Sequence, residues 1–141
     1  IIEGGELLRI TLRIVTAVVR HDVAIVDPLP AGLEAVNNSF ATTSRAPVEA
    51  PKTSGGSAEL PEYGGSWVFD HSEIDDDGVR LYADYMPPGI HIYRYVARAT
   101  TPGTYDHPAA TAEEMYEPEN FGRTAAGRFT VSAANEKVAT K

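Results

Sequence analysis

The sequence predicts an all-β fold, an antiparallel β-sandwich, on three observations. Several short segments alternate apolar and polar residues with a period of two, which is typical of strands with one buried face. Turn-forming glycine and proline separate these segments, with 12 and 10 copies in 141 residues. A helical period is almost absent from the chain.

The first strands are expected near the N-terminus. Residues 8–14 carry leucine or isoleucine at every second position, with arginine or threonine between them. Residues 21–27 (HDVAIVD) are a short run rich in β-branched residues. This run ends at DPLPAG, residues 27–32, because two prolines and a glycine interrupt a strand ladder. A further strand is predicted over residues 33–36.

The same alternation continues in the rest of the chain. Residues 67–70 (WVFD) predict a short strand that leads into an acidic turn at residues 73–78, and residues 79–85 alternate again. Residues 90–99 (IHIYRYVARA) predict the longest strand, and residues 128–132 predict the last. One face of the longest strand carries Tyr93, Tyr95, Ala97 and Ala99, and the other presents Arg94 and Arg98 to solvent.

Three segments lack strand periodicity. Residues 41–65 hold three prolines and four glycines, which predicts a long, flexible surface loop, either functional or a dispensable insertion. Residues 112–117 predict a short helical turn that stops because Pro118 disfavours α geometry at the preceding residue. The polar tail, residues 133–141, is expected to fray.

The length of 141 residues predicts a single β-sandwich domain, residues 1–141, with a core that needs no metal or disulfide. The first residues, IIEGGELLRI, lack a methionine and a basic leader, so we expect a fragment of a larger protein. The net charge is −8 without a basic cluster, which argues against nucleic acid as a partner. The sequence contains no run of 18 apolar residues, so no membrane contact of this domain is expected. The absence of cysteine excludes thiol chemistry within the chain.

An acidic segment raises the question of calcium. From Glu73 to Asp84, carboxylates fall at positions 1, 3, 5 and 12 and a glycine at position 6 of a twelve-residue calcium loop. The match is partial, because position 1 is Glu, position 12 is Asp and strands flank the segment. A solvated acidic hairpin turn is the favoured interpretation.

Catalytic and metal-binding patterns are otherwise missing. None of the histidines, at positions 21, 71, 91 and 107, has the spacing that presents two ligands on one helix face. The adjacent Asp70, His71 and Ser72 point to alternate faces of a strand and cannot form a relay. The sequence therefore predicts no catalytic residue, no metal site, no cofactor and no enzyme activity.

Residues 112–124 (AEEMYEPENFGRT) place Met115, Tyr116 and Phe121 among four glutamates. Burying each of these side chains stabilises by roughly 1.5–3 kcal/mol, so exposure calls for a reason. Three interpretations are open: the side chains plug the end of the sandwich core, they dock onto a neighbouring domain, or they lie in an incidentally exposed loop. The residues alone leave these alternatives open.

Three stretches together resemble the last macroglobulin-type domain of bacterial alpha-2-macroglobulins. They are DPLPAGLEAVN (residues 27–37), the segment 67–105 and AEEMYEPENFGRTAAGRFTV (residues 112–131). The most specific pieces are YRYVARATTPG (residues 93–103) and AEEMYEPENFGR (residues 112–123). The resemblance implies an Ig-like, macroglobulin-type sandwich.

The resemblance also implies a function. The domain is expected to be the non-catalytic C-terminal part of a secreted or periplasmic protease trap, packing on a thioester domain and shielding the thioester from water. Met115, Tyr116 and Pro118 match the loop whose tyrosine gives this protection, and Glu114, Phe121 and Arg123 are expected to help docking. The thioester itself must lie outside a chain without cysteine. The alternative is an Ig-like stalk or adhesion module of a bacterial surface protein.

Overall fold

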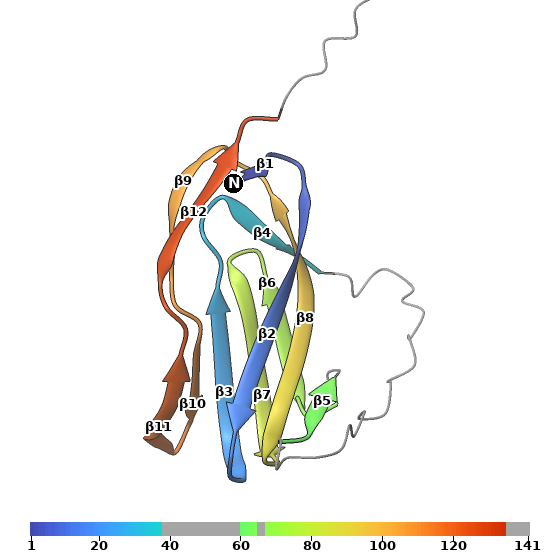
Figure 1. Ribbon diagram of the computed structural model, residues 1–141, viewed down its shortest axis with the longest axis vertical. Coiled ribbons are helices and arrows are strands. Elements are labelled where there is room, and N and C mark those ends of the chain that lie inside the picture. Colours follow the sequence, from blue (N-terminus) through green and yellow to red (C-terminus); the bar gives the residue numbers. More distant parts are fainter. Residues whose placement is uncertain (38–59, 65–66, 135–141) are drawn as a thin grey trace, which may run out of the picture.

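The computed structural model describes residues 1–37, 60–64 and 67–134, and every regular element in these ranges is a β-strand. The strands form two main sheets packed face to face and a small third sheet at one end (Figure 1). Most neighbouring strands are antiparallel. The predicted all-β antiparallel sandwich is therefore confirmed. The described residues contain no helix long and apolar enough to cross a membrane.

The larger sheet has five strands in the order β11-β10-β3-β7-β6. Its middle strand, β3, pairs with β7 on one side and with β10 on the other. The β10–β11 hairpin is thus an extension of this sheet beyond β3. The strands are β3 (Arg20–Pro28), β6 (His71–Asp75), β7 (Gly78–Met86), β10 (Thr111–Glu114) and β11 (Glu117–Arg123).

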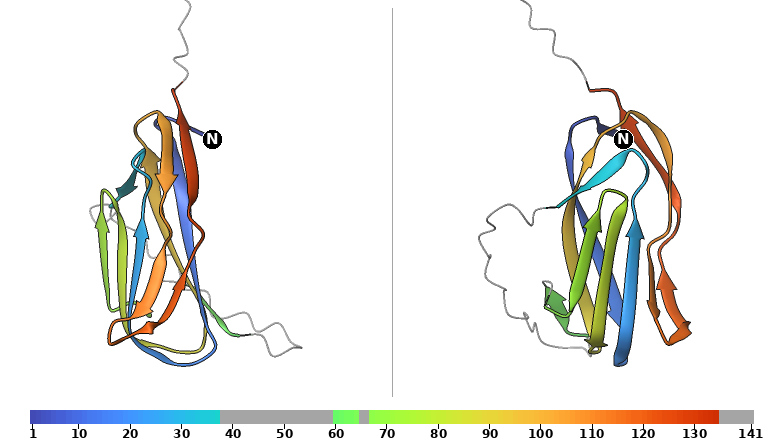
Figure 2. Two further views of the ribbon diagram at one scale, coloured as in Figure 1. Left: turned by 90° about the vertical axis from the view of Figure 1, so that its left-hand side faces the viewer. Right: turned by 180° about the vertical axis from the view of Figure 1, so that it is seen from behind.

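The second sheet has the order β2-β8-β4, with β5 also beside β8, and the small third sheet has the order β1-β12-β9. In all views the turns β2–β3, β7–β8 and β10–β11 lie at the same end of the sandwich (Figure 2). The strands are β1 (Ile2–Glu3), β2 (Leu7–Thr16), β4 (Leu33–Val36), β5 (Glu62–Gly64), β8 (Gly89–Ala99), β9 (Gly103–His107) and β12 (Gly127–Ser132).

The core lies between the two main sheets and follows the alternation of the strands. Tyr93, Tyr95, Ala97 and Ala99 of β8 face inward and are at most 8% exposed, as the sequence predicts. The facing sheet contributes alternate residues of β3 and β7 to the same cluster. On the outer face of β8, Arg94 and Arg98 are exposed, which confirms the predicted orientation of this strand.

One hydrogen bond joins the two main sheets through buried side chains. The hydroxyl of Tyr95 on β8 donates to a carboxylate oxygen of Asp27 on β3 at 2.6 Å, and Asp27 is only 5% exposed. Burial first, and then the hydrogen bond to Asp27, raise the pKa of Tyr95 well above its ordinary value. The phenol therefore stays protonated and keeps a donor for a carboxylate that is cut off from water.

The predicted helical turn at residues 112–117 is wrong. Thr111–Glu114 form strand β10, Met115 and Tyr116 form a turn, and β11 starts at Glu117. The segment pairs with β3 over four residues, and these long-range backbone hydrogen bonds override the helical preference of Ala and Glu. Pro118 lies in a gap of the β10–β11 pairing, between Glu117 and Phe121, and does not end a helix.

Two other expectations are changed. The segment 67–70 is a turn and not a strand, although Val68 and Phe69 are buried. The strand at this place in the chain is β6, which starts at His71, so the acidic turn is reduced to Asp76 and Asp77. Of the predicted loop 41–65, residues 41–59 and 65 lie outside the described residues, while Glu62–Gly64 form β5. Most of the predicted frayed tail, residues 135–141, also lies outside them.

Removing the hydroxyl in Tyr95→Phe should destabilise the domain by about 1–3 kcal/mol, because the carboxylate of Asp27 stays buried without its donor. Urea unfolding followed by circular dichroism measures this change. Tyr85→Phe is the matched control. Tyr85 is 53% exposed, so the loss of its hydroxyl should leave the stability of the domain unchanged. Equal stability of both variants would contradict the role of the inter-sheet bond.

Candidate docking site on the β10–β11 hairpin

The β10–β11 hairpin has a two-residue tip followed by a bulge. Glu114 pairs with Glu117, so only Met115 and Tyr116 form the turn, while Glu113 pairs with Phe121. Three residues, 118–120, are therefore extra on β11. Pro118 falls in this bulge, where its missing N–H breaks no ladder hydrogen bond.

The large apolar side chains of the hairpin point to solvent. Tyr116 is 81% exposed, Phe121 66% and Met115 44%. Pro118 and Arg123 are exposed as well. The interpretation that these residues plug the core of their own sandwich is wrong, because strand pairing with β3 carries the hairpin tip beyond the core. A phenol ring at a tight turn is a protruding group available to another surface.

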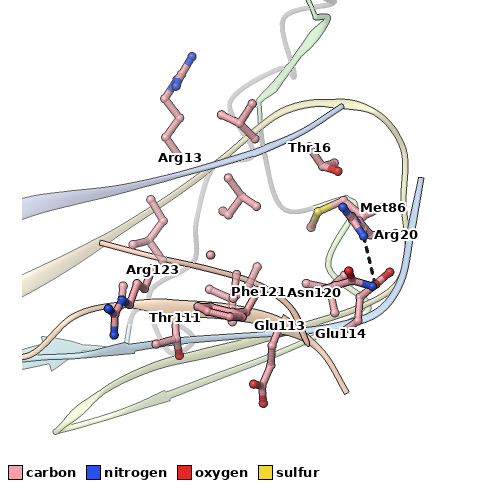
Figure 3. Close-up of a pocket in the computed structure, with 18 of the residues that line it drawn as sticks. Arg13, Thr16, Arg20, Met86, Thr111, Glu113, Glu114, Asn120, Phe121 and Arg123 are labelled. Atoms are coloured by element: carbon pink, nitrogen blue, oxygen red, sulfur yellow. Dashed lines mark hydrogen bonds and ion pairs between the residues drawn. The ribbon is translucent and has the colours of Figure 1, made fainter. Parts of the chain in front are cut away.

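Glu114 ties the hairpin to the start of β3 (Figure 3). Its carboxylate accepts the backbone N–H of His21 at 3.0 Å, the side-chain amide of Asn120 at 2.6 Å and the guanidinium of Arg20 at 3.3 Å. The bond from His21 is the main reason that the pKa of Glu114 lies below its ordinary value. Desolvation opposes it, and the hydrogen bond from Asn120 and the charge of Arg20 lower the pKa further. With its side chain only 12% exposed, Glu114 serves its own hairpin.

A second bond fixes the tip from the backbone. The N–H of Met115 donates to the carbonyl of Asp22 at 2.8 Å. Asp22 has a φ of 50°, in the left-handed region that Asp tolerates better than most residues. Because Glu114 and Met115 are both held by consecutive residues of β3, the turn that carries Tyr116 has a set direction.

A groove of about 540 Å³ runs between the hairpin and strand β2 (Figure 3). Arg13 lies on the rim and points away from it, and Arg20 lies near the hairpin end. Apolar side chains from both main sheets line this groove. Among its lining residues are Leu12, Ile14, Val23, Ile25, Met86 and Phe121.

The acidic segment 73–84 forms the β6–β7 hairpin and not a loop. Arg80 pairs with Asp75 at 2.7 Å and with Asp77 at 3.7 Å, so two of the three central carboxylates face a cation of their own hairpin. The favoured interpretation, a solvated acidic turn, agrees with this arrangement. Within the described ranges, no three residues of the His, Cys, Asp and Glu types gather as metal ligands.

The described histidines sit in separate surroundings. The carboxylate of Asp70 accepts the backbone N–H of Asp84 at 2.7 Å, so the structure does not join Asp70, His71 and Ser72 in a relay. Three histidine rings contact three different tyrosines: His21 with Tyr85, His71 with Tyr82 and His91 with Tyr63.

The comparison with known families decides what kind of domain this is. The family described as "Bacterial Alpha-2-macroglobulin MG10 domain" matches residues 2–119. The chain belongs to this family.

The relatives of this MG10 domain include bacterial alpha-2-macroglobulins and one protein of another name. The alpha-2-macroglobulin homolog of Nostoc is 37% identical over 127 residues, which are 90% of this chain and 6% of that protein. Trypsin-activated alpha-2-macroglobulin of Escherichia coli superposes with a TM-score of 0.71 at 25% identity, over 93% of this chain and 9% of that chain. Circularly permutated Ras protein 2 of Dictyostelium discoideum is 28% identical over 128 residues, 91% of this chain and 3% of that protein. The chain thus spans a small part of each relative.

The residues that position the hairpin of this MG10 domain could not be predicted from local sequence patterns. Arg20 and His21 lie more than 90 residues before Glu114, and no local pattern connects them with it. Asn120 is closer, six residues after Glu114, and the bulge that brings it back depends on the pairing of β10 with β11. A local signal is Pro118, two residues before Asn120, because proline favours a break in strand pairing at that point.

Replacing Glu114→Gln should loosen the tip, because the neutral amide is a weaker acceptor for the N–H of His21 and for Asn120. We expect amide hydrogen exchange at Met115 and Tyr116 to become several-fold faster by NMR. Glu113→Gln is the matched control, since this neighbouring glutamate is exposed. Equal exchange in the two variants would show that strand pairing alone fixes the tip.

Acid should release the same contact. The folded pKa of Glu114 is lowered from about 4.5, so its contribution to stability is complete above 4.5 and is lost as the pH falls through the folded pKa. The amide shift of His21 in an NMR titration should follow a single proton uptake with a midpoint below the ordinary value of a glutamate side chain. A midpoint at or above the ordinary glutamate value would contradict the hydrogen-bonding arrangement.

Proposed function

We propose that this chain is the non-catalytic, C-terminal MG10 domain of a bacterial alpha-2-macroglobulin-like protease inhibitor. The family match carries the proposal, and the small share of each relative that the chain spans supports a larger parent protein. Neighbouring domains of that parent are the direct partners, and target proteases are met through the parent. The proposed location is periplasmic or extracellular.

The exposed Tyr116 carries the proposed role of the domain. In the resting inhibitor its ring packs on a neighbouring thioester domain and keeps water from the thioester until a protease activates the molecule. A thioester survives in a site closed to water, and an aromatic ring is a large, stiff cover with a hydroxyl that can hydrogen-bond nearby. An exposed fraction of 81% leaves the ring available for this contact.

The surroundings of Tyr116 fit the proposal. Met115 and Pro118 flank the ring, and burying the three side chains against a partner would remove an unfavourable apolar exposure from water. Phe121 and Arg123 extend the exposed surface along β11. Glu114 takes the part of a positioning residue, since its carboxylate holds the tip to β3.

The second candidate function is an Ig-like stalk or adhesion module of a bacterial surface protein. A related segment also occurs in circularly permutated Ras protein 2, a protein whose name is not that of a macroglobulin, so a domain of this kind is not confined to proteins named as inhibitors. The two functions differ in the parent sequence. An inhibitor has a Cys-x-Glu-Gln segment in a preceding domain, whereas a stalk has tandem copies of similar β-sandwich domains.

Replacing Tyr116→Gly in the full-length parent should speed the loss of the thioester at least tenfold, because water gains access. Methylamine incorporation and the appearance of a free thiol measure the rate. Tyr116→Phe should keep most of the protection if the ring is the cover. Trp67→Gly is the control, as an exposed aromatic residue that lies away from the hairpin. An unchanged rate in Tyr116→Gly would refute the shield.

A further inference from the structure

Strand β2 has a free edge. It pairs with β8 over ten consecutive residues, Leu7–Thr16, without a register shift, and no described strand pairs with its other side. Natural sheets usually blunt such an edge with a proline, a bulge or an inward-pointing charge. LLRITLRIVT has none of these three features, although its outward-facing Arg9 and Arg13 are edge charges of a kind that also discourages pairing. Strand β2 therefore offers a long, regular row of backbone donors and acceptors to a segment that matches these charges.

The inward face of β2 is incompletely covered. The inward residues of the neighbouring strand β8 are almost completely buried, as Ala97 and Ala99 at 0% exposure show. Every inward residue in the middle of β2 is only partly buried, although it packs on the same core. The groove beside β2 is lined by two of these residues, Leu12 and Ile14, which leaves them open to a further side chain. The partly buried residues are Leu8, Ile10, Leu12 and Ile14.

The outer face of the same edge is cationic. Arg9 and Arg13 of β2 lie diagonally across from Arg94 of β8, and such neighbours are about 7–8 Å apart. Arg98 follows four residues further along β8 and is also diagonally across from Arg9. Like charges at this spacing repel, which makes the cluster costly without an anion.

No ion pair joins a described carboxylate to any of these four arginines, although Glu34 of β4 lies directly opposite Arg98 in the sheet. Arg9, Arg13 and Arg94 have no such acidic neighbour across the paired strands. Arg20, Arg80 and Arg128, in contrast, each pair with an acidic residue of their own domain. The chain has a formal charge of −8, so it contains more carboxylates than arginines and lysines together. A shortage of carboxylates therefore does not explain why arginines on one sheet face lack an ion pair. The pattern favours a negatively charged partner at this face.

We propose that the free edge of β2 binds an extended segment with alternating apolar and acidic residues from another domain of the parent protein. The segment adds a strand to the β2-β8-β4 sheet. Its apolar side chains enter the groove beside Leu12 and Ile14, and its acidic side chains meet Arg9 and Arg13 on the outer face. This one strand pattern satisfies the backbone edge, the groove and the charges together.

The occupant follows from charge and from chain length. A second copy of this domain would bring a second set of unpaired arginines to the same edge, and like charges opposite each other disfavour that pairing. The chain covers 6% of the Nostoc relative, so a parent of that kind has ample sequence to supply a strand. The inference rests on the proposed function only in taking this chain as one domain of a larger protein, and it does not require shielding by Tyr116.

Photo-cross-linking in the full-length parent tests the proposal. A p-benzoylphenylalanine replaces Thr11, which faces outward on β2 between the two arginines. Mass spectrometry should locate the cross-link on a segment outside residues 1–141 in which at least two Asp or Glu residues alternate with apolar ones. The double variant Arg9→Glu/Arg13→Glu should lower the yield at least tenfold, and 1 M salt should lower it too.

Two matched controls accompany this test. The photo-reactive residue in place of Glu73, on the edge strand β6 of the other sheet, should give no cross-link to that segment. Arg128→Glu, which removes an exposed cation elsewhere, should leave the yield at Thr11 unchanged. Cross-links confined to residues 1–141, cross-links between two copies, or a yield unaffected by charge reversal would overturn the proposal.

The outcome is separable from that of the thioester experiment. If cross-linking at Thr11 succeeds while Tyr116→Gly leaves thioester loss unchanged, the edge proposal stands and the shield fails. If Tyr116→Gly accelerates thioester loss while cross-linking at Thr11 fails, the shield stands and the edge proposal is overturned.

Discussion

The carboxylate of Glu114 is the contact on which the candidate site depends. It gathers donors from the start of β3 and from the bulge of β11, two segments separated by about 100 residues in the chain. A two-residue turn at the end of a sheet extension would otherwise be held by strand pairing alone. A held tip loses less conformational entropy on docking, so more of the contact energy of Tyr116 remains for binding.

Strand β3 connects the fixed hairpin tip to the rest of the sandwich. Near its end, Asp27 is bonded to Tyr95 of the opposite sheet, and near its start His21 is bonded to Glu114 of the hairpin. Pairing with both β7 and β10 keeps the strand inside its sheet between these two contacts. The exposed tip is therefore connected to the buried core through one strand, and not through a flexible linker.

Sequence patterns predicted the parts of this fold that depend on local alternation. The β8 segment around Tyr93 and Tyr95 is such a case, because inward and outward residues are visible along one strand. The β10 segment is the opposite case, because Ala and Glu favour a helix and only pairing with Val23 and Val26 makes a strand. The shielding role that the family resemblance implies for Tyr116 stays a prediction, whereas the donors around Glu114 follow from contacts between distant segments.

The two surfaces flank one groove and carry opposite charges. The hairpin side presents exposed Glu113, Glu117 and Glu119 around its apolar tip, while the outer face of β2 and β8 presents unpaired arginines. A neighbour that contacts both sides must itself carry a matching separation of charge. Electrostatic complementarity of this kind sets the orientation of docking more than its strength. The charge pattern would then determine where on the neighbour the ring of Tyr116 binds. The ring itself would determine how well the contact excludes water.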